Sequence, residues 1–245
     1  MEKMISAKAK RGVLKGIVSL LSLFRLLPEN DTPKEYKTFV GGNIPEKIRQ
    51  SLVEAYIQIF SEPPWYENWE AEQVKEKIEK DLSSPTSFLV LFIEKGVVGG
   101  FVWGNIINGS NVLKRAAAAM NVKEEEITIH LGNENVLYCD EFAILRSARR
   151  GITTVRLLLR ETLAYGINNN APNCIFWSTP QSRIVPLANT MGYEERGKTK
   201  MRDKDIKFFY LPTSVFLYKM TFLDERISRA MMSLVSKNKS KNRSD

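Results

Sequence analysis

The spacing of hydrophobic positions changes several times along the chain, and each change predicts a different element. Residues 11–27 place apolar side chains on one face and basic side chains on the other, as in a basic amphipathic helix. Helical spacing predicts further helices over 45–60, 72–82, 111–120, 151–165 and 186–191, with Gly166 placed to end the fourth of these. Runs of aliphatic and aromatic residues predict strands over 87–93, 97–103, 136–145 and 174–178, followed by extended segments over 193–200 and 207–219.

This order of elements predicts one α/β domain, with a hairpin at its front and a strand-helix-strand crossover in its middle. The predicted boundaries are an amphipathic helix and linker over 1–37, the domain over 38–222, and a basic, partly disordered tail over 223–245. Residues 105–134 separate two predicted strands and are interpreted as an insertion.

The positive charge of the chain lies at its two ends. Lys and Arg number 36 and Asp and Glu 28, for a net charge of +8, but residues 1–28 and 226–245 each hold six cations and one anion. The body between them is therefore close to neutral. The helix over 11–27 can dock on the protein's own core or on a partner, lie on an anionic membrane surface, or serve as a targeting peptide. We expect no specific nucleic-acid binding.

The composition excludes several classes of protein. Two cysteines, Cys139 and Cys174, are too few for a disulfide scaffold and are expected to be buried, inert thiols on neighbouring strands. The single histidine, His130, argues against histidine-based metal sites and Ser/His or Cys/His catalysis, so we expect no metal. No apolar run is long enough for a membrane span, which favours a reduced, cytoplasmic setting with at most peripheral membrane contact through residues 11–27.

The segment with the most chemical information joins the strand over 136–145 to the following helix. The first N–H groups of a helix have no partner within the helix and lie at its positive end, so such a turn can hold a phosphate. This turn adds the cations Arg149 and Arg150, the small residue Gly151, and the hydroxyls of Thr153 and Thr154.

At this point the sequence resembles the GNAT superfamily of acetyl-coenzyme A-dependent N-acyltransferases. Asp140-Glu141-Phe142-Ala143-Ile144 is similar to the family's acidic strand, and the turn through Gly151 is similar to its Arg/Gln-x-x-Gly-x-Gly/Ala motif, with Ala148 and Thr153 at two motif positions. The similarity continues in three further segments: Val98-Gly99-Gly100-Phe101 in the hairpin, the Pro-Pro-aromatic stretch within 60–67, and the late motif at Gln181, Leu187, Met191, Gly192 and Tyr193.

The resemblance implies a fold, a donor and a set of site residues. The fold is a central mixed, mostly antiparallel sheet flanked by helices on both faces, and the acyl donor is acetyl-CoA. Contacts to the donor fall to Phe142, Ala143 and Ile144 for pantetheine and to Arg149, Arg150, Gly151, Ile152, Thr153 and Thr154 for the phosphates. The family's general-acid tyrosine aligns with Ala188, and Pro186 would shorten its helix.

For the acceptor amine, the resemblance offers Glu141 or Asp140 as general base. Because strand side chains alternate between faces, we expect only one of the two to face the substrate, and of the two we favour Glu141. Glu141 can also be an ordinary strand-end carboxylate. Trp65, Tyr66 and Tyr138 are candidates for the acceptor pocket, although Trp65, Tyr66 and Trp69 can equally pack a loop beside prolines.

Three hypotheses stay open. The protein transfers acetyl from acetyl-CoA to a primary amine of a small molecule or peptide; it is a GNAT-like binding or scaffold domain without catalysis; or it binds membranes or nucleic acid through its basic ends. The sequence leaves the acceptor, the length of the acyl chain and the oligomeric state open.

Overall fold

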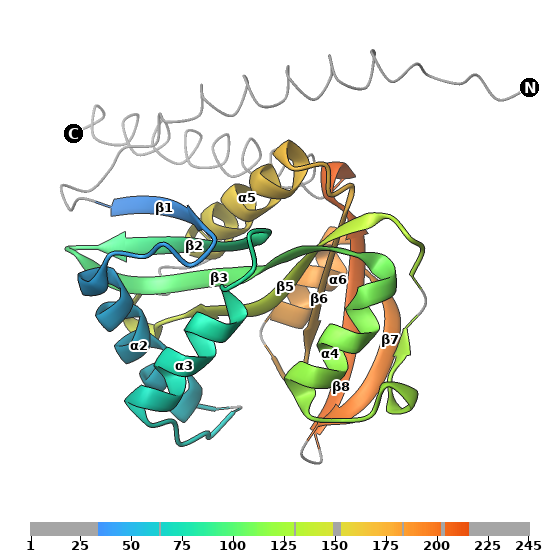
Figure 1. Ribbon diagram of the computed structural model, residues 1–245, viewed down its shortest axis with the longest axis horizontal. Coiled ribbons are helices and arrows are strands. Elements are labelled where there is room, and N and C mark those ends of the chain that lie inside the picture. Colours follow the sequence, from blue (N-terminus) through green and yellow to red (C-terminus); the bar gives the residue numbers. More distant parts are fainter. Residues whose placement is uncertain are drawn as a thin grey trace, which may run out of the picture.

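An eight-stranded sheet organises the residues that the computed structural model describes, which are 34–63, 65–129, 131–148, 153–182, 184–201 and 204–215 (Figure 1). The strands are β1 (Lys34–Val40), β2 (Ser87–Glu94), β3 (Val97–Asn108), β4 (Thr128–Ile129), β5 (Asn135–Ile144), β6 (Asn173–Ser178), β7 (Glu194–Met201) and β8 (Lys204–Pro212). The helices are α2 (Glu46–Ser61), α3 (Ala71–Asp81), α4 (Val112–Met120), α5 (Thr153–Asn168) and α6 (Ile184–Met191), with short 3-10 turns η1 (Gly109–Asn111), η2 (Glu124–Glu126) and η3 (Arg146–Ala148).

The strand order is β1-β2-β3-β5-β6-β8-β7-β4. Neighbouring strands are antiparallel except β5 and β6, which are parallel because α5 joins them as a crossover helix. The sheet is therefore mixed and mostly antiparallel, as predicted.

Helices pack on both faces of the sheet. On one face, Tyr56 of α2 stacks on Phe101 and Trp103 of β3, with ring centroids 6.0 and 5.6 Å apart. On the other face, Leu158 of α5 lies against Gly100 of the same strand, where a Cβ would be 3.1 Å from the leucine side chain. All of these side chains are buried, so the core lies on both sides of β3. This arrangement confirms the predicted α/β fold with helices on both faces.

A β-bulge and a strand separation mark the middle of the sheet. Trp103 pairs with Glu141 but Gly104 pairs with Cys139, so Asp140 is the extra residue of the bulge. A Cβ on Gly104 would overlap the carbonyl oxygen of Tyr138, so the close approach of the two strands requires glycine there. The parallel pairing of β5 with β6 ends at Cys139, and no ladder pair joins them beyond it within the described residues.

Two strands differ from the sequence prediction. β1 begins inside the segment assigned to the linker, and its alternation was hidden because this edge strand carries few apolar residues; Tyr36 packs on Phe92 with ring centroids 5.3 Å apart. β3 continues past Trp103 into the predicted insertion, where residues up to Asn108 pair with the first half of β5.

Two predicted ends were also wrong. Gly166 lies inside α5, which continues to Asn168; a Cβ on Gly166 would lie 2.9 Å from the Leu137 side chain, so this glycine permits close helix-strand packing rather than a cap. The last strand ends at Pro212, before the predicted residue 219. The predicted helix over 11–27 and the tail over 223–245 lie outside the described residues. None of the described helices is long and apolar enough to cross a bilayer.

Candidate active site

Glu141 lies on the face of the sheet that carries α2 and α3. Its Oε1 accepts a hydrogen bond from the Tyr56 hydroxyl at 3.3 Å and lies 3.2 Å from Nζ of Lys77, and its side chain is only 12% exposed. Burial raises the pKa of Glu141 to about 7; Lys77 lowers it and Asp81 raises it. This carboxyl group can therefore exchange a proton near neutral pH, as a general base must.

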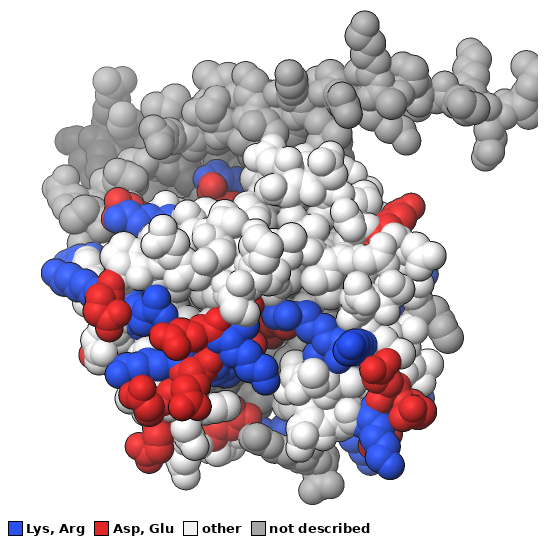
Figure 2. All heavy atoms as spheres, in the orientation of Figure 1, with Lys and Arg blue, Asp and Glu red and all other residues white. Residues whose placement is uncertain are grey.

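Lys77 of α3 connects Glu141 to a second carboxylate. Its Nζ lies 2.8 Å from Oδ2 of Asp81, one helical turn away, and 5.9 Å from the centre of the Trp103 ring. The Trp103 indole N–H donates to the same Asp81 oxygen at 3.3 Å. Burial lowers the pKa of Lys77, but Glu141 and Asp81 outweigh it and raise the pKa overall, so the lysine stays protonated. Figure 2 shows acidic and basic side chains intermixed over the region of α2 and α3.

Asp140 forms a separate ion pair with Arg115 of α4. The guanidinium contacts both carboxylate oxygens, with Nε 2.9 Å from Oδ1 and Nη2 2.6 Å from Oδ2. Burial raises the pKa of Asp140 to about 6 even though Arg115 lowers it. Because both oxygens are engaged by one guanidinium, Asp140 positions α4 and is a poorer candidate for the base than Glu141.

The bulge corrects the prediction that only one of the two acidic side chains faces the acceptor side. Asp140 contacts α4 and Glu141 contacts α2 and α3, and all three helices cover the same face of the sheet (Figure 1). Strand alternation fails here because Asp140 is the extra residue, so it and Glu141 lie on one side.

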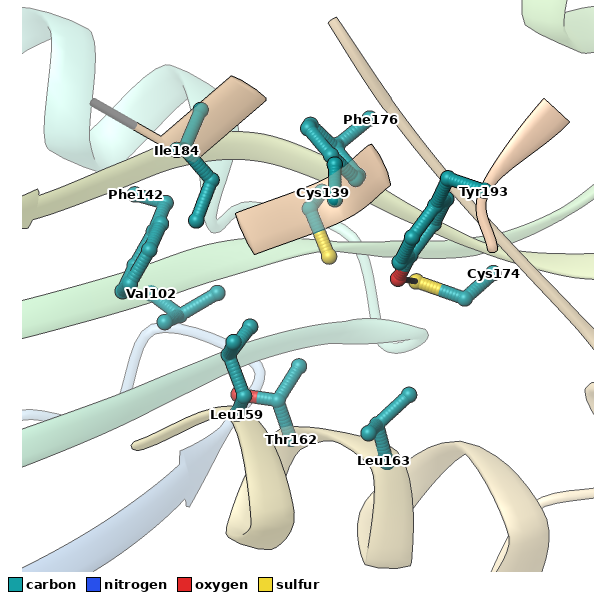
Figure 3. Close-up of a pocket in the computed structure, with 11 residues that line it drawn as sticks. Val102, Cys139, Phe142, Leu159, Thr162, Leu163, Cys174, Phe176, Ile184 and Tyr193 are labelled. Atoms are coloured by element: carbon teal, nitrogen blue, oxygen red, sulfur yellow. Dashed lines mark hydrogen bonds between the residues drawn. The ribbon is translucent and has the colours of Figure 1, made fainter. Parts of the chain in front are cut away.

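The opposite face of β5 carries an apolar cavity of about 20 Å³, room for roughly one water molecule (Figure 3). Phe142, Cys139, Cys174, Ala188 and Tyr193 are among its lining residues. The Tyr193 hydroxyl donates to Sγ of Cys174 at 3.7 Å. A hydrogen bond with Cys174 and burial raise the pKa of the Cys139 thiol, which favours the inert thiol. Ala188 places no hydroxyl in this cavity.

A wider hollow of about 390 Å³ lies between the α2–α3 connection and the β7–β8 hairpin. Its lining includes Trp65, Tyr66 and Trp69, and the Tyr66 side chain is well exposed. Trp69 packs edge-on against Tyr56 with ring centroids 5.6 Å apart, and Tyr56 in turn contacts Glu141. One aromatic wall thus connects the hollow to the carboxylate.

The third predicted acceptor residue lies elsewhere. Tyr138 is fully buried in a cluster with Val112 and Ala116 of α4 and does not line the hollow. Strand side chains alternate between the two faces of the sheet, and Tyr138 lies on the face that α4 covers. The structure thus places Tyr138 in the core beneath α4, and its part in an acceptor pocket stays a prediction.

The predicted phosphate turn is described only in part. Arg149, Arg150, Gly151 and Ile152 lie outside the described residues, as does His130. α5 begins at Thr153, as a helix N-terminus facing phosphate requires. Thr154 is buried and its hydroxyl donates to the carbonyl of Ala148 at 3.1 Å, so that hydroxyl serves the turn itself and is not offered to a ligand.

Four residues around the acidic pair were not identified from the sequence: Tyr56, Lys77, Asp81 and Arg115. The Lys77/Asp81 spacing of four residues was the one local signal, and it is also typical of a solvated helix face. Arg115 lies 25 residues from Asp140 in the predicted insertion, where no pattern links the two. The described residues contain no group of three or more His, Cys, Asp or Glu side chains that could hold a metal ion.

No protein-family model matches the sequence, and no curated protein is significantly similar to it. Solved structures do match. An uncharacterized protein from Bacillus halodurans is 9% identical, with 78% of this chain and 90% of that chain covered and a TM-score of 0.53. A spermidine N-acetyltransferase from Vibrio cholerae in complex with CoA and spermine is 13% identical, with coverage of 74% and 98% and a TM-score of 0.48.

An acetyltransferase of the GNAT family from Streptococcus pneumoniae is also 13% identical, with coverage of 74% and 99% and a TM-score of 0.46. At these identities the likeness concerns the fold, a mixed α/β domain with an open sheet.

Proposed function

We propose that this protein is an N-acetyltransferase that transfers acetyl from acetyl-CoA to a primary amine of a small molecule or peptide. The observation that carries the proposal is the edge of β5 from Asp140 to Ala143, where no described residue of β6 pairs with it, together with Glu141 directly after the bulge. An open strand edge can receive an extended chain as an added strand, and the pantetheine arm of CoA bears amides suited to that pairing.

On the donor side, the proposal assigns the main chain of Phe142, Ala143 and Ile144 to the pantetheine arm. The phosphates would lie at the start of α5, where Arg149 and Arg150 add charge and Gly151 and Ile152 add main-chain N–H groups. Acetyl-CoA supplies an activated thioester carbonyl. The cavity beside Phe142 is too small for the arm, so the separation of β5 and β6 is the route that fits it.

On the acceptor side, Glu141 takes the proton of the attacking amine. Tyr56 and Lys77 both contact Oε1, whereas Oε2 accepts no hydrogen bond from the described residues and is left to take the proton. The amine nitrogen bonds to the acetyl carbon, the carbon–sulfur bond breaks, and CoA departs as the thiolate. Ala188 offers that thiolate no proton, so its departure does not depend on an acid at this position.

Calorimetric titration with acetyl-CoA, followed by turnover with a panel of primary amines, tests the proposal. We expect saturable binding of acetyl-CoA, weaker binding of fragments of CoA that lack the phosphate groups, and acetylated product with at least one amine. Absence of acetyl-CoA binding at millimolar concentration would overturn the proposal. Comparing acetyl-CoA with longer acyl-CoA thioesters in the same titration reports the acyl length that the site accepts.

Activity is expected to rise with pH through about 7. Glu141 acts as a base only when deprotonated, and because burial raises its pKa to about 7, the active fraction increases as the pH passes upward through this value. The charged groups around it are Lys77, which lowers the pKa, and Asp81 and Asp140, which raise it. A profile of kcat from about pH 3.5 to about pH 9 checks this; a midpoint near the ordinary carboxyl pKa of 4.5 would contradict it.

The same fold without catalysis is the second candidate, and two observations favour it. Ala188 stands in the cavity wall where the resemblance expects a tyrosine, and Lys77 already contacts the proposed base. Acetyl-CoA binding without product from any amine would support this candidate. Membrane or nucleic-acid binding through residues 11–27 and the C-terminal tail stays a prediction, which co-sedimentation with anionic vesicles or DNA, with and without residues 1–28, would test.

A further inference from the structure

The ammonium group of Lys77 lies in a cage made by α3, β3 and β5. Asp81 contributes Oδ2 at 2.8 Å, Glu141 contributes Oε1 at 3.2 Å, and the ring of Trp103 lies 5.9 Å from Nζ. We call these three residues the ammonium cage. Two carboxylates and an aromatic face match the three N–H donors and the positive charge of a primary ammonium group.

The cage has more acceptor capacity than its own donors use. Tyr56, Lys77 and Trp103 all contact Oδ2 of Asp81 or Oε1 of Glu141. Oδ1 of Asp81 and Oε2 of Glu141 accept nothing from the described residues. Beside them, Asn105 donates to the main-chain oxygen of Asp81 at 3.3 Å, while its own Oδ1 is buried with no hydrogen-bond partner among the described residues. The region can therefore accept hydrogen bonds from a further donor.

Solvent reaches the cage. The side chains of Lys77, Asp81 and Glu141 are 22%, 17% and 12% exposed, so the ammonium group is covered only in part. Removing the lysine side chain beyond Cβ would leave a space with the size and chemistry of n-propylammonium. The ammonium group in this cage thus belongs to Lys77, but an external alkylammonium ion of the same size would fit the same space.

We propose that the ammonium cage is the binding site for a primary alkylammonium group, and that Lys77 occupies it as an internal competitor. The inference deepens the proposed function, on which its acceptor role rests: an acceptor amine would replace Lys77 beside Glu141. In this proposal Lys77 is the resident ammonium group of the cage, held by Asp81 and Glu141, and not the acyl acceptor. Because α3 carries Lys77, the position of α3 then determines how readily an external amine enters the ammonium cage.

Chemical rescue of Lys77→Ala by n-propylammonium chloride tests this inference without acetyl-CoA. The unfolding midpoint of Lys77→Ala should rise with n-propylammonium concentration, because a ligand that binds the folded state stabilises it. Wild-type protein should bind n-propylammonium at least about tenfold more weakly, since its lysine must first leave the cage. Tetramethylammonium, which has the same charge but no N–H donor, should give no more effect than sodium chloride.

Two matched variants complete the test. Lys77→Met keeps an apolar side chain in the space and should show no rescue, and Lys77→Ala combined with Asp81→Asn should lose it. If Lys77→Ala does not fold alone, refolding in n-propylammonium should restore it. Equal responses of Lys77→Ala to n-propylammonium and tetramethylammonium, or none to either, would overturn the inference. Absence of acetyl transfer would overturn the proposed function alone, because the rescue needs no donor.

Discussion

Replacing Glu141 with Gln is expected to lower kcat by about 100-fold or more, because a positioned general base contributes about 10²–10⁴ to the rate. Glutamine has the shape of glutamate and keeps an oxygen for the Tyr56 hydroxyl, but it cannot take a proton. Lys77 keeps Asp81 as an ionic partner, so the fold should persist. Steady-state kinetics across pH measures the loss, and the rise in activity near pH 7 should disappear together with it.

Glu125→Gln is the matched control for this variant. Glu125 is exposed in η2, and replacing it with glutamine removes the same charge at a position away from the site. Its kcat should equal that of the unmodified protein within a factor of about two. If Glu141→Gln retained full kcat while Glu125→Gln behaved as expected, Glu141 would not be the base. The neighbouring carboxylates Asp81 and Asp140 would then have to be tested in turn.

The elements that the sequence predicted well are those whose hydrophobic period is strong. α2, α3, β2 and β6 begin and end within about one residue of the predicted ranges, because each buries a continuous apolar face. β1 was missed because an edge strand buries little, and its pairing with β2 depends on main-chain hydrogen bonds that leave no pattern in the side chains. Gly166 was misjudged because a glycine at a helix end and one at a close helix-strand contact look the same in sequence.

The candidate site was predicted in its strand but not in its surroundings. The family resemblance identified Asp140 and Glu141, yet their shared face depends on a bulge that only the pairing of β5 with β3 creates. The partners Lys77 and Arg115 come from helices 64 and 25 residues away from the acids they contact, so no local motif could connect them. The sequence shows that Lys77 and Arg115 are charged. It does not show that they form ion pairs with the buried acids, because this pairing depends on how the helices pack on the sheet.

Gly104→Ala is the variant with the largest expected effect on stability. A Cβ at this position would overlap the carbonyl oxygen of Tyr138 and lie 2.9 Å from Cα of Cys139, and both are main-chain atoms that cannot turn aside. We expect a loss of about 3 kcal/mol or more in the free energy of unfolding. For a chain of this size that corresponds to a fall of roughly 6–12 °C in the unfolding midpoint, measured by circular dichroism.

The control is Gly132→Ala, because a Cβ there meets no atom within 4 Å, and its free energy of unfolding should change by no more than about 0.5 kcal/mol. The comparison also tests the site, since the bulge opposite Gly104 is what places Asp140 and Glu141 on one face. Any Gly104→Ala protein that folds should therefore lose acetyl transfer beyond its loss of stability. Equal midpoints for the two variants would mean that β3 and β5 approach less closely than described, and the shared face of the two acids would lose its basis.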